Sequence, residues 1–168
     1  PYQRGSIVRV PLSDARRVAV GVVGDLDGTG GLLGFFFLLD KLPADLAKLA
    51  KLTPSQAVLI THCGDLGLID GTWKVLQGPA PDFDRQLWQR LEFGFQQELT
   101  HRWLIRTYEP GSFGWPKTRP ATEAEVRKLP QDGMAGSGWV EEALSDLAAE
   151  QRDKPTKPAA PPRRRAAA

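Results

Sequence analysis

The chain has 168 residues, of which 41% are hydrophobic and 25% are charged, values that are typical of a soluble globular domain. Its longest apolar run, residues 31–39, has about half the length that a membrane-spanning helix requires, so the sequence predicts no membrane partner. The single cysteine, Cys63, excludes an intramolecular disulfide and fits a reducing compartment. Because no secretory signal pattern is visible either, we expect a cytoplasmic protein.

Charge is distributed unevenly along the chain. Residues 151–168 contain six basic residues and one acidic residue, a net charge of +5, which leaves −3 for residues 1–150 because the whole chain carries +2. The basic segment is rich in proline and alanine, so we expect one folded domain over residues 1–150 and a disordered tail over residues 151–168. The three arginines at 163–165 suit contact with nucleic acid or another anionic surface. A solvated extension without a specific partner is the alternative.

The first half of the chain has the pattern of a β-meander. β-Branched runs at residues 7–12 and 17–23 are followed, after a turn-rich gap, by the apolar run at 31–39. Apolar residues alternate with small ones in the second run, as in a strand. Because residues 35–37 are three consecutive phenylalanines, that strand must place large side chains on both faces and should be central.

Further elements follow in order. Residues 42–51 are predicted to form a short helix, and residues 57–61, 72–76, 91–96 and 101–107 to form strands, about seven strands in all. Thr122 and Glu125 have the spacing of a capping box, which starts a helix that ends before Pro130. A second helix, 139–150, presents one apolar face. We therefore expect an α+β fold in which a strongly curved, mainly antiparallel, barrel-like sheet is covered by C-terminal helices.

Few residues suit catalysis. His62 and Cys63 are adjacent, and neighbours on a strand point to opposite faces, so they cannot form a nucleophile–base pair on a regular strand. A metal site built from His62, Cys63 and His101 has no support from spacing. The residues therefore predict no catalytic group, no metal and no cofactor.

Acidic turns are the first candidate for partner binding. Residues 25–30 match the first half of a calcium-binding loop, but Phe36 stands where a bidentate glutamate is required, so a hairpin turn is the preferred interpretation. If the turns meet at one end of the sheet, their carboxylates form an acidic rim that suits a basic partner. Ordinary solvated turns are the alternative. The rim would contain Asp25, Asp27, Asp65 and Asp70.

An aromatic loop is the second candidate. Residues 111–116 contain Phe113 and Trp115 between glycines and a proline. Exposed aromatic side chains of this kind anchor many protein–protein interfaces. In the alternative interpretation both side chains tuck beneath their own loop.

Six short motifs occur in order along the chain. They are Gly-x-Ile-x-x-Val-Pro-Leu from Gly5, Gly-Val-Val from Gly21, Gly-Phe-Phe from Gly34, Gly-Thr-Trp-Lys-Val-Leu-Gln-Gly from Gly71, Arg-Pro-Ala-Thr-Glu-Ala-Glu-Val from Arg119 and Val-Glu-Glu-Ala-Leu from Val140. Over residues 2–147 this series resembles the bacterial immunity protein 26 family. The resemblance implies a mostly β domain of a polymorphic toxin system, which binds a cognate toxin and neutralises it by steric occlusion, without catalysis.

Two other functions stay open at this stage. A small β-barrel that binds nucleic acid through its basic tail and exposed aromatic residues would show salt-sensitive binding that is lost without residues 151–168. An enzyme would need two carboxylates brought together in a cleft.

Overall fold

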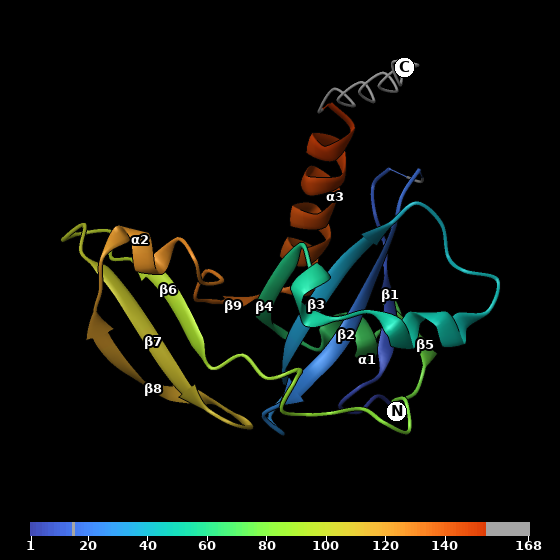
Figure 1. Ribbon diagram of the computed structural model, residues 1–168, viewed down its shortest axis with the longest axis horizontal. Coiled ribbons are helices and arrows are strands. Elements are labelled where there is room, and N and C mark those ends of the chain that lie inside the picture. The colour runs from blue at the N-terminus through green and yellow to red at the C-terminus, as the bar shows by residue number, and fades with distance from the viewer. Residues whose placement is uncertain (15, 154–168) are drawn as a thin grey trace, which may run out of the picture.

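The computed structural model describes residues 1–14 and 16–153. Within them the fold is α+β, with nine strands in two sheets that lie side by side and four short helices or helical turns beside one longer helix (Figure 1). All strand pairs but one are antiparallel. The expected tail begins inside the last helix, and residues 154–168 lie outside the described residues.

The larger sheet has six strands in the order β5-β1-β2-β3-β4-β9. The strands are β1 (Ile7–Val10), β2 (Val18–Leu26), β3 (Gly31–Leu39), β4 (Leu59–Gly64), β5 (Lys74–Gln77) and β9 (Met134–Ala135). The first three form the antiparallel meander that the sequence predicts. β3 is central and covered on both faces, which confirms the expectation from its three consecutive phenylalanines.

Each face of the six-stranded sheet has its own core. On one face Phe36 packs edge-on against Trp73, together with Val140 and Leu144 of α3 (Ser137–Asp153). On the other face Phe35 and Phe37 pack against Trp88 and reach the smaller sheet. The alternation of β3 side chains therefore divides the apolar residues of the chain between two cores.

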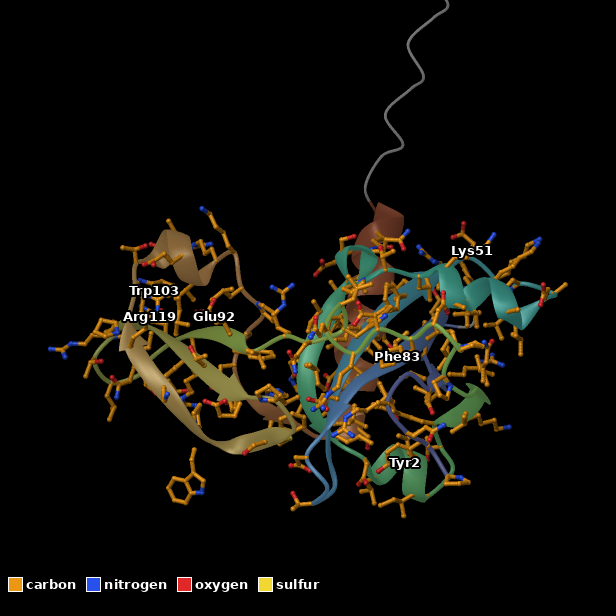
Figure 2. The ribbon with its side chains drawn as sticks, turned by 60° about the horizontal axis from the view of Figure 1, so that its bottom comes forward. Tyr2, Lys51, Phe83, Glu92, Trp103 and Arg119 are labelled. Atoms are coloured by element: carbon orange, nitrogen blue, oxygen red, sulfur yellow. The ribbon has the colours of Figure 1, made fainter. Side chains whose placement is uncertain are left out.

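The smaller sheet has three strands in the order β6-β7-β8. These are β6 (Glu92–Gln96), β7 (Trp103–Glu109) and β8 (Ser112–Pro120), and α2 (Glu123–Val126) packs on the first two. Phe93 and Ile105 are buried, whereas most of β8 is exposed. Figure 2 shows Glu92, Trp103 and Arg119 on this sheet, far from Tyr2 and Phe83, which lie beside the larger one.

One segment connects the two sheets by backbone hydrogen bonds. Gly94 of β6 donates to Pro130 at 2.9 Å and accepts from Asp132 at 2.9 Å, and the chain then continues as β9, which pairs with β4 in parallel. The segment 130–135 thus belongs to both sheets. It lies between them in Figure 1.

The structure differs from the sequence-based expectation in two elements. The strands form two sheets and no closed barrel within residues 1–14 and 16–153. The expected aromatic loop at 111–116 belongs mostly to strand β8. Prolines at 116 and 120 disguise this strand in the sequence, but an edge strand tolerates proline because one of its sides is not hydrogen-bonded.

The remaining helices are short. The helix expected over 42–51 is a 3₁₀ helix, η1 (Leu46–Lys51), that begins after Asp45, whose side chain accepts a hydrogen bond from the Ala47 N–H. The others are η2 (Pro54–Gln56) and α1 (Leu66–Ile69). The capping box of Thr122 and Glu125 at the start of α2 is confirmed. None of the described helices combines the length and apolar character needed to cross a bilayer.

Candidate partner-binding surface

Asp25 is not part of an exposed rim. Its side chain is 3% exposed and forms ion pairs with Arg4 and with Arg85, the latter at 3.2 Å. It also accepts hydrogen bonds from the backbone N–H groups of Leu26 and Gly111, at 2.9 and 2.8 Å. Burial alone would raise the pKa of Asp25, but these hydrogen bonds outweigh it and lower the pKa. The expectation for Asp25 is therefore corrected: it is a structural carboxylate inside the protein.

Asp27 and Asp65 lie at the same end of the larger sheet. Asp27 accepts hydrogen bonds from the N–H groups of Thr29 and Gly31 at 2.8 and 2.9 Å, which closes the β2–β3 hairpin. Asp65 donates its N–H to the carbonyl of Gly30 in that hairpin at 2.9 Å and accepts the Tyr2 hydroxyl. Burial and the Asp65 hydrogen bond raise the pKa of Tyr2 to about 12. The hairpin interpretation is confirmed.

Asp70 is exposed and closes a turn of its own. Its carboxylate accepts the Thr72 N–H at 2.8 Å, and the hydrogen bonds from Thr72 lower its pKa. Among the described residues no group of three or more histidine, cysteine, aspartate or glutamate side chains is arranged to hold a metal ion. Asp27 and Asp65 thus both hydrogen-bond the β2–β3 hairpin, whereas the Asp25 side chain is buried and Asp70 closes a separate turn.

His62 and Cys63 point to opposite faces, as expected for neighbours on β4. His62 lies among the rings of Phe93, Tyr108 and Phe113, with centroid distances of 4.4, 4.7 and 4.2 Å. Burial lowers the pKa of His62 to about 4, against the opposing pull of nearby carboxylates. Burial raises the pKa of the Cys63 thiol to about 12. Both side chains are uncharged near neutral pH and serve packing.

Phe113 and Trp115, which the sequence analysis assigns to one aromatic loop, have opposite environments. Phe113 tucks against His62, whereas the Trp115 side chain is 99% exposed. The cause is a large bulge: Ser112 pairs with Glu109 and Lys117 pairs with Thr107, so residues 113–116 face Tyr108 alone. Trp115 has a φ of +54° in this bulge, a left-handed conformation that is rare for bulky residues.

A groove lies beside the bulge. It has a volume of about 460 Å³ and is lined by residues of β7, β8 and the segment 132–134. Its lining includes Phe113, Trp115 and Pro116 of β8 and Met134, which is largely exposed. A second hollow of about 300 Å³ shares residues 132–134 with the groove and extends to Trp139, which is half-exposed. We call this continuous area the Trp115 surface.

Three polar side chains hold the floor of the groove. Asp132, which is 2% exposed, accepts a hydrogen bond from Arg106 at 2.6 Å on one carboxylate oxygen and from the Tyr108 hydroxyl at 2.6 Å on the other. Burial and the Asp132 hydrogen bond raise the pKa of Tyr108. Arg106 also covers the ring of Phe95, with its guanidinium carbon 4.3 Å from the centroid. Both oxygens of Asp132 are thus occupied by this chain.

Sequence reasoning missed most of the Trp115 surface. The sequence indicates Trp115, but Met134, Trp139 and Asp132 come from a glycine-rich stretch and a helix start to which the sequence assigns no partner. The available signal was the cluster of large residues around glycines at 133, 136 and 138. Periodicity cannot show that this stretch returns to the β7–β8 hairpin, because that contact spans the two sheets.

No protein-family model matches the chain. The search of curated proteins and the search of solved structures give no match either. The resemblance to the immunity protein 26 family therefore rests on the motifs given above.

Proposed function

We propose that this chain is a bacterial immunity protein that binds a cognate toxin through the Trp115 surface and blocks it sterically, without catalysis. The observation that carries the proposal is the Trp115 side chain, which is fully exposed on a left-handed backbone position. The family resemblance of the motifs supplies the kind of partner. The expected place of action is the cytoplasm of the producing cell.

Trp115 is costly to the isolated chain in two ways. A bulky residue at positive φ costs on the order of 1–3 kcal/mol, and its indole ring gains nothing from burial because none of the residues that the structure describes covers it. Covering about 200 Å² of such a ring contributes on the order of 5 kcal/mol before the costs of association. A side chain held in this way is suited to anchor a partner, as tryptophan does in many interfaces.

The groove provides the complementary feature. An anchor that projects beside a hollow lets a partner both cover Trp115 and insert a side chain between Phe113 and Met134. The adjoining hollow at Trp139 extends this apolar area. An interface of ordinary size, about 1,600 Å² in total, would reach from β8 to the start of α3.

The polar groups favour binding over turnover. Arg106 and Tyr108 each bind one oxygen of the Asp132 carboxylate, and His62 is buried and neutral. A general base must come within hydrogen-bond reach of a substrate, and the Asp132 side chain is 2% exposed. The polar floor instead fixes the position of the hairpin that carries Trp115.

The test is co-expression with the toxin encoded next to this chain. We expect co-purification and suppression of toxicity for the unaltered chain, and loss of both for Trp115→Ala. Leu99→Ala is the matched control, because Leu99 is equally exposed on another turn and does not line the groove. Failure of the unaltered chain to bind or protect would reject the immunity role.

A truncated chain that ends at residue 153 distinguishes the immunity proposal from the nucleic-acid-binding alternative. The immunity proposal expects unchanged toxin binding after truncation. Salt-sensitive binding of nucleic acid that disappears with residues 154–168 would favour the alternative instead.

A further inference from the structure

A separate hollow lies on the other side of the segment that connects the two sheets. It has a volume of about 370 Å³ and lies between the start of β4 and the chain after α2. Part of its lining is apolar, from residues 57–60 before and at the start of β4 and from Leu129, and we call this part the apolar wall. Three cationic residues also line the hollow, namely Arg90, Arg127 and Lys128. Its lining contains no acidic residue. We call it the basic pocket.

Arg90 has an unmet hydrogen-bonding requirement. Its Nε atom is buried, and it is the only buried side-chain nitrogen or oxygen within the described residues that lacks a hydrogen-bond partner. Leaving such a donor unpaired costs about 1–3 kcal/mol, and more when the group is charged. Arg90 also lines the hollow, and a small rotation of its side chain would let the guanidinium group meet an acceptor bound there.

The other two cations are available to the same acceptor. Arg127 forms an ion pair with Glu123 one helical turn earlier, and both side chains are well exposed. Exposed pairs of this spacing contribute only about 0.3–0.5 kcal/mol, so Arg127 can turn to a stronger acceptor at little cost. Lys128 follows it directly and is exposed. Arginine forks bind phosphate through paired N–H groups, and lysine adds a mobile charge.

We propose that the basic pocket binds a phosphate group, either as the free ion or as the monoester of a small molecule whose body rests on the apolar wall. Three cations without a lining carboxylate match a dianion better than a single negative charge. The pocket lies between two sheets, which is a common position for small-ligand sites. Phosphate binding here does not depend on toxin binding.

The experiment uses the full chain and two probes, inorganic phosphate and adenosine monophosphate. Two-dimensional NMR spectra that detect arginine Nε–H groups follow each titration. We expect saturable shifts centred on the Arg90 Nε–H for both probes, and tighter binding of the monoester if its body contacts the apolar wall. Tighter binding of the free ion would assign the pocket to inorganic phosphate, which the proposal includes.

Variants locate the site. Arg90→Lys keeps the charge but removes the buried Nε donor, and we expect phosphate binding at least about tenfold weaker. Arg127→Gln and Lys128→Gln, both at exposed positions, should each weaken it several-fold, and Arg102→Gln, exposed and outside the pocket, should leave it unchanged. Phosphate shifts that are absent, that do not saturate, or that persist in Arg90→Lys would overturn the proposal. So would a clear preference for succinate over phosphate.

Discussion

The two sheets of this protein differ in how much of their surface is buried. The six-stranded sheet is covered on both faces, and β3 buries seven consecutive residues, Gly31 to Phe37. The three-stranded sheet is less completely covered: Phe93 packs on His62 of the larger sheet and Gly94 on α2, but the edge strand β8 has no fully buried residue. The first sheet therefore holds the core of the molecule, while the second presents side chains.

This difference in burial determines which strand can carry a bulge and a projecting side chain. A strand that is packed on both sides cannot accept a bulge of several residues without opening a cavity. An edge strand with a free face can, and β8 uses this freedom to hold Trp115 outward. Asp25 then fixes the hairpin to the larger sheet through the Gly111 N–H.

Removal of the Asp25 carboxylate should have the largest effect on stability. Asp25→Ala leaves two arginines and two backbone N–H groups without their acceptor. We expect the free energy of unfolding to fall by about 3–5 kcal/mol, as for other buried ion pairs that lose one partner. Urea denaturation measures this loss.

The matched control is Asp70→Ala. Asp70 is exposed and closes only its own turn, so we expect a far smaller change in the free energy of unfolding than for Asp25→Ala. Equal effects of the two substitutions would contradict the distinction between a buried carboxylate that links the sheets and a solvated one.

The interface between the sheets should be sensitive to pH through His62. Its pKa lies near 4 in the folded protein and near the ordinary 6.5 in the unfolded chain. Between these values the unfolded chain binds a proton that the folded protein does not, so stability falls as the pH is lowered from 6.5 to 4. The expected loss is about 3 kcal/mol at pH 4 relative to pH 7.

Denaturation curves across this range, compared with those of His62→Phe, isolate the contribution. The variant cannot take up the proton, so its stability should change much less between pH 7 and pH 4. His101→Asn, at an exposed position with a positive φ, should keep the full pH dependence. A His62→Phe variant that is as pH-dependent as the unaltered chain would refute the assignment.

Relief of the strained bulge should have a smaller effect, and of opposite sign. Glycine adopts a φ near +54° freely, so Trp115→Gly should stabilise the isolated chain by about 1 kcal/mol. Thermal unfolding would show this as a raised midpoint. Leu99→Gly, at a position with an ordinary φ, should give no such gain, and a destabilised Trp115→Gly variant would show that the ring packs on the chain.

The cap of α2 should have the smallest effect. Thr122→Ala removes the hydroxyl that accepts the Glu125 N–H at 3.2 Å, and we expect a loss of about 1 kcal/mol or less because the helix is short and exposed. Chemical denaturation against Thr118→Ala, an exposed threonine of β8 outside the cap, measures it. A loss as large as that of Asp25→Ala would mean that α2 supports the smaller sheet far more than its contacts indicate.

Local signals predicted most of the elements. The meander of β1 to β3, the strands β6 and β7, and the capping box of Thr122 all follow from residue patterns within a few positions. Two features could not follow from them. The division into two sheets depends on contacts between distant segments, above all 130–135 with both Gly94 and β4. The prolines of β8 hid an edge strand.

The candidate site was predicted only in part, for the same reason. The local sequence around an acidic residue in a turn does not show whether its carboxylate is solvated or ion-paired. Asp70 is solvated, whereas Asp25 is ion-paired with two arginines. Phe113 and Trp115 are two residues apart, and only the bulge decides that one is covered and the other is exposed. The basic pocket joins Arg90 to residues 127 and 128, which no short pattern connects.

The decisive measurement is the affinity of the neighbouring toxin for Trp115→Gly, determined by calorimetry beside the unaltered chain and Leu99→Ala. We expect a variant that is at least as stable as the unaltered chain and yet binds about 30-fold more weakly or worse, a loss of about 2 kcal/mol or more. Leu99→Ala should bind normally. Full affinity of Trp115→Gly for a toxin that binds the unaltered chain would contradict the central role of the Trp115 surface.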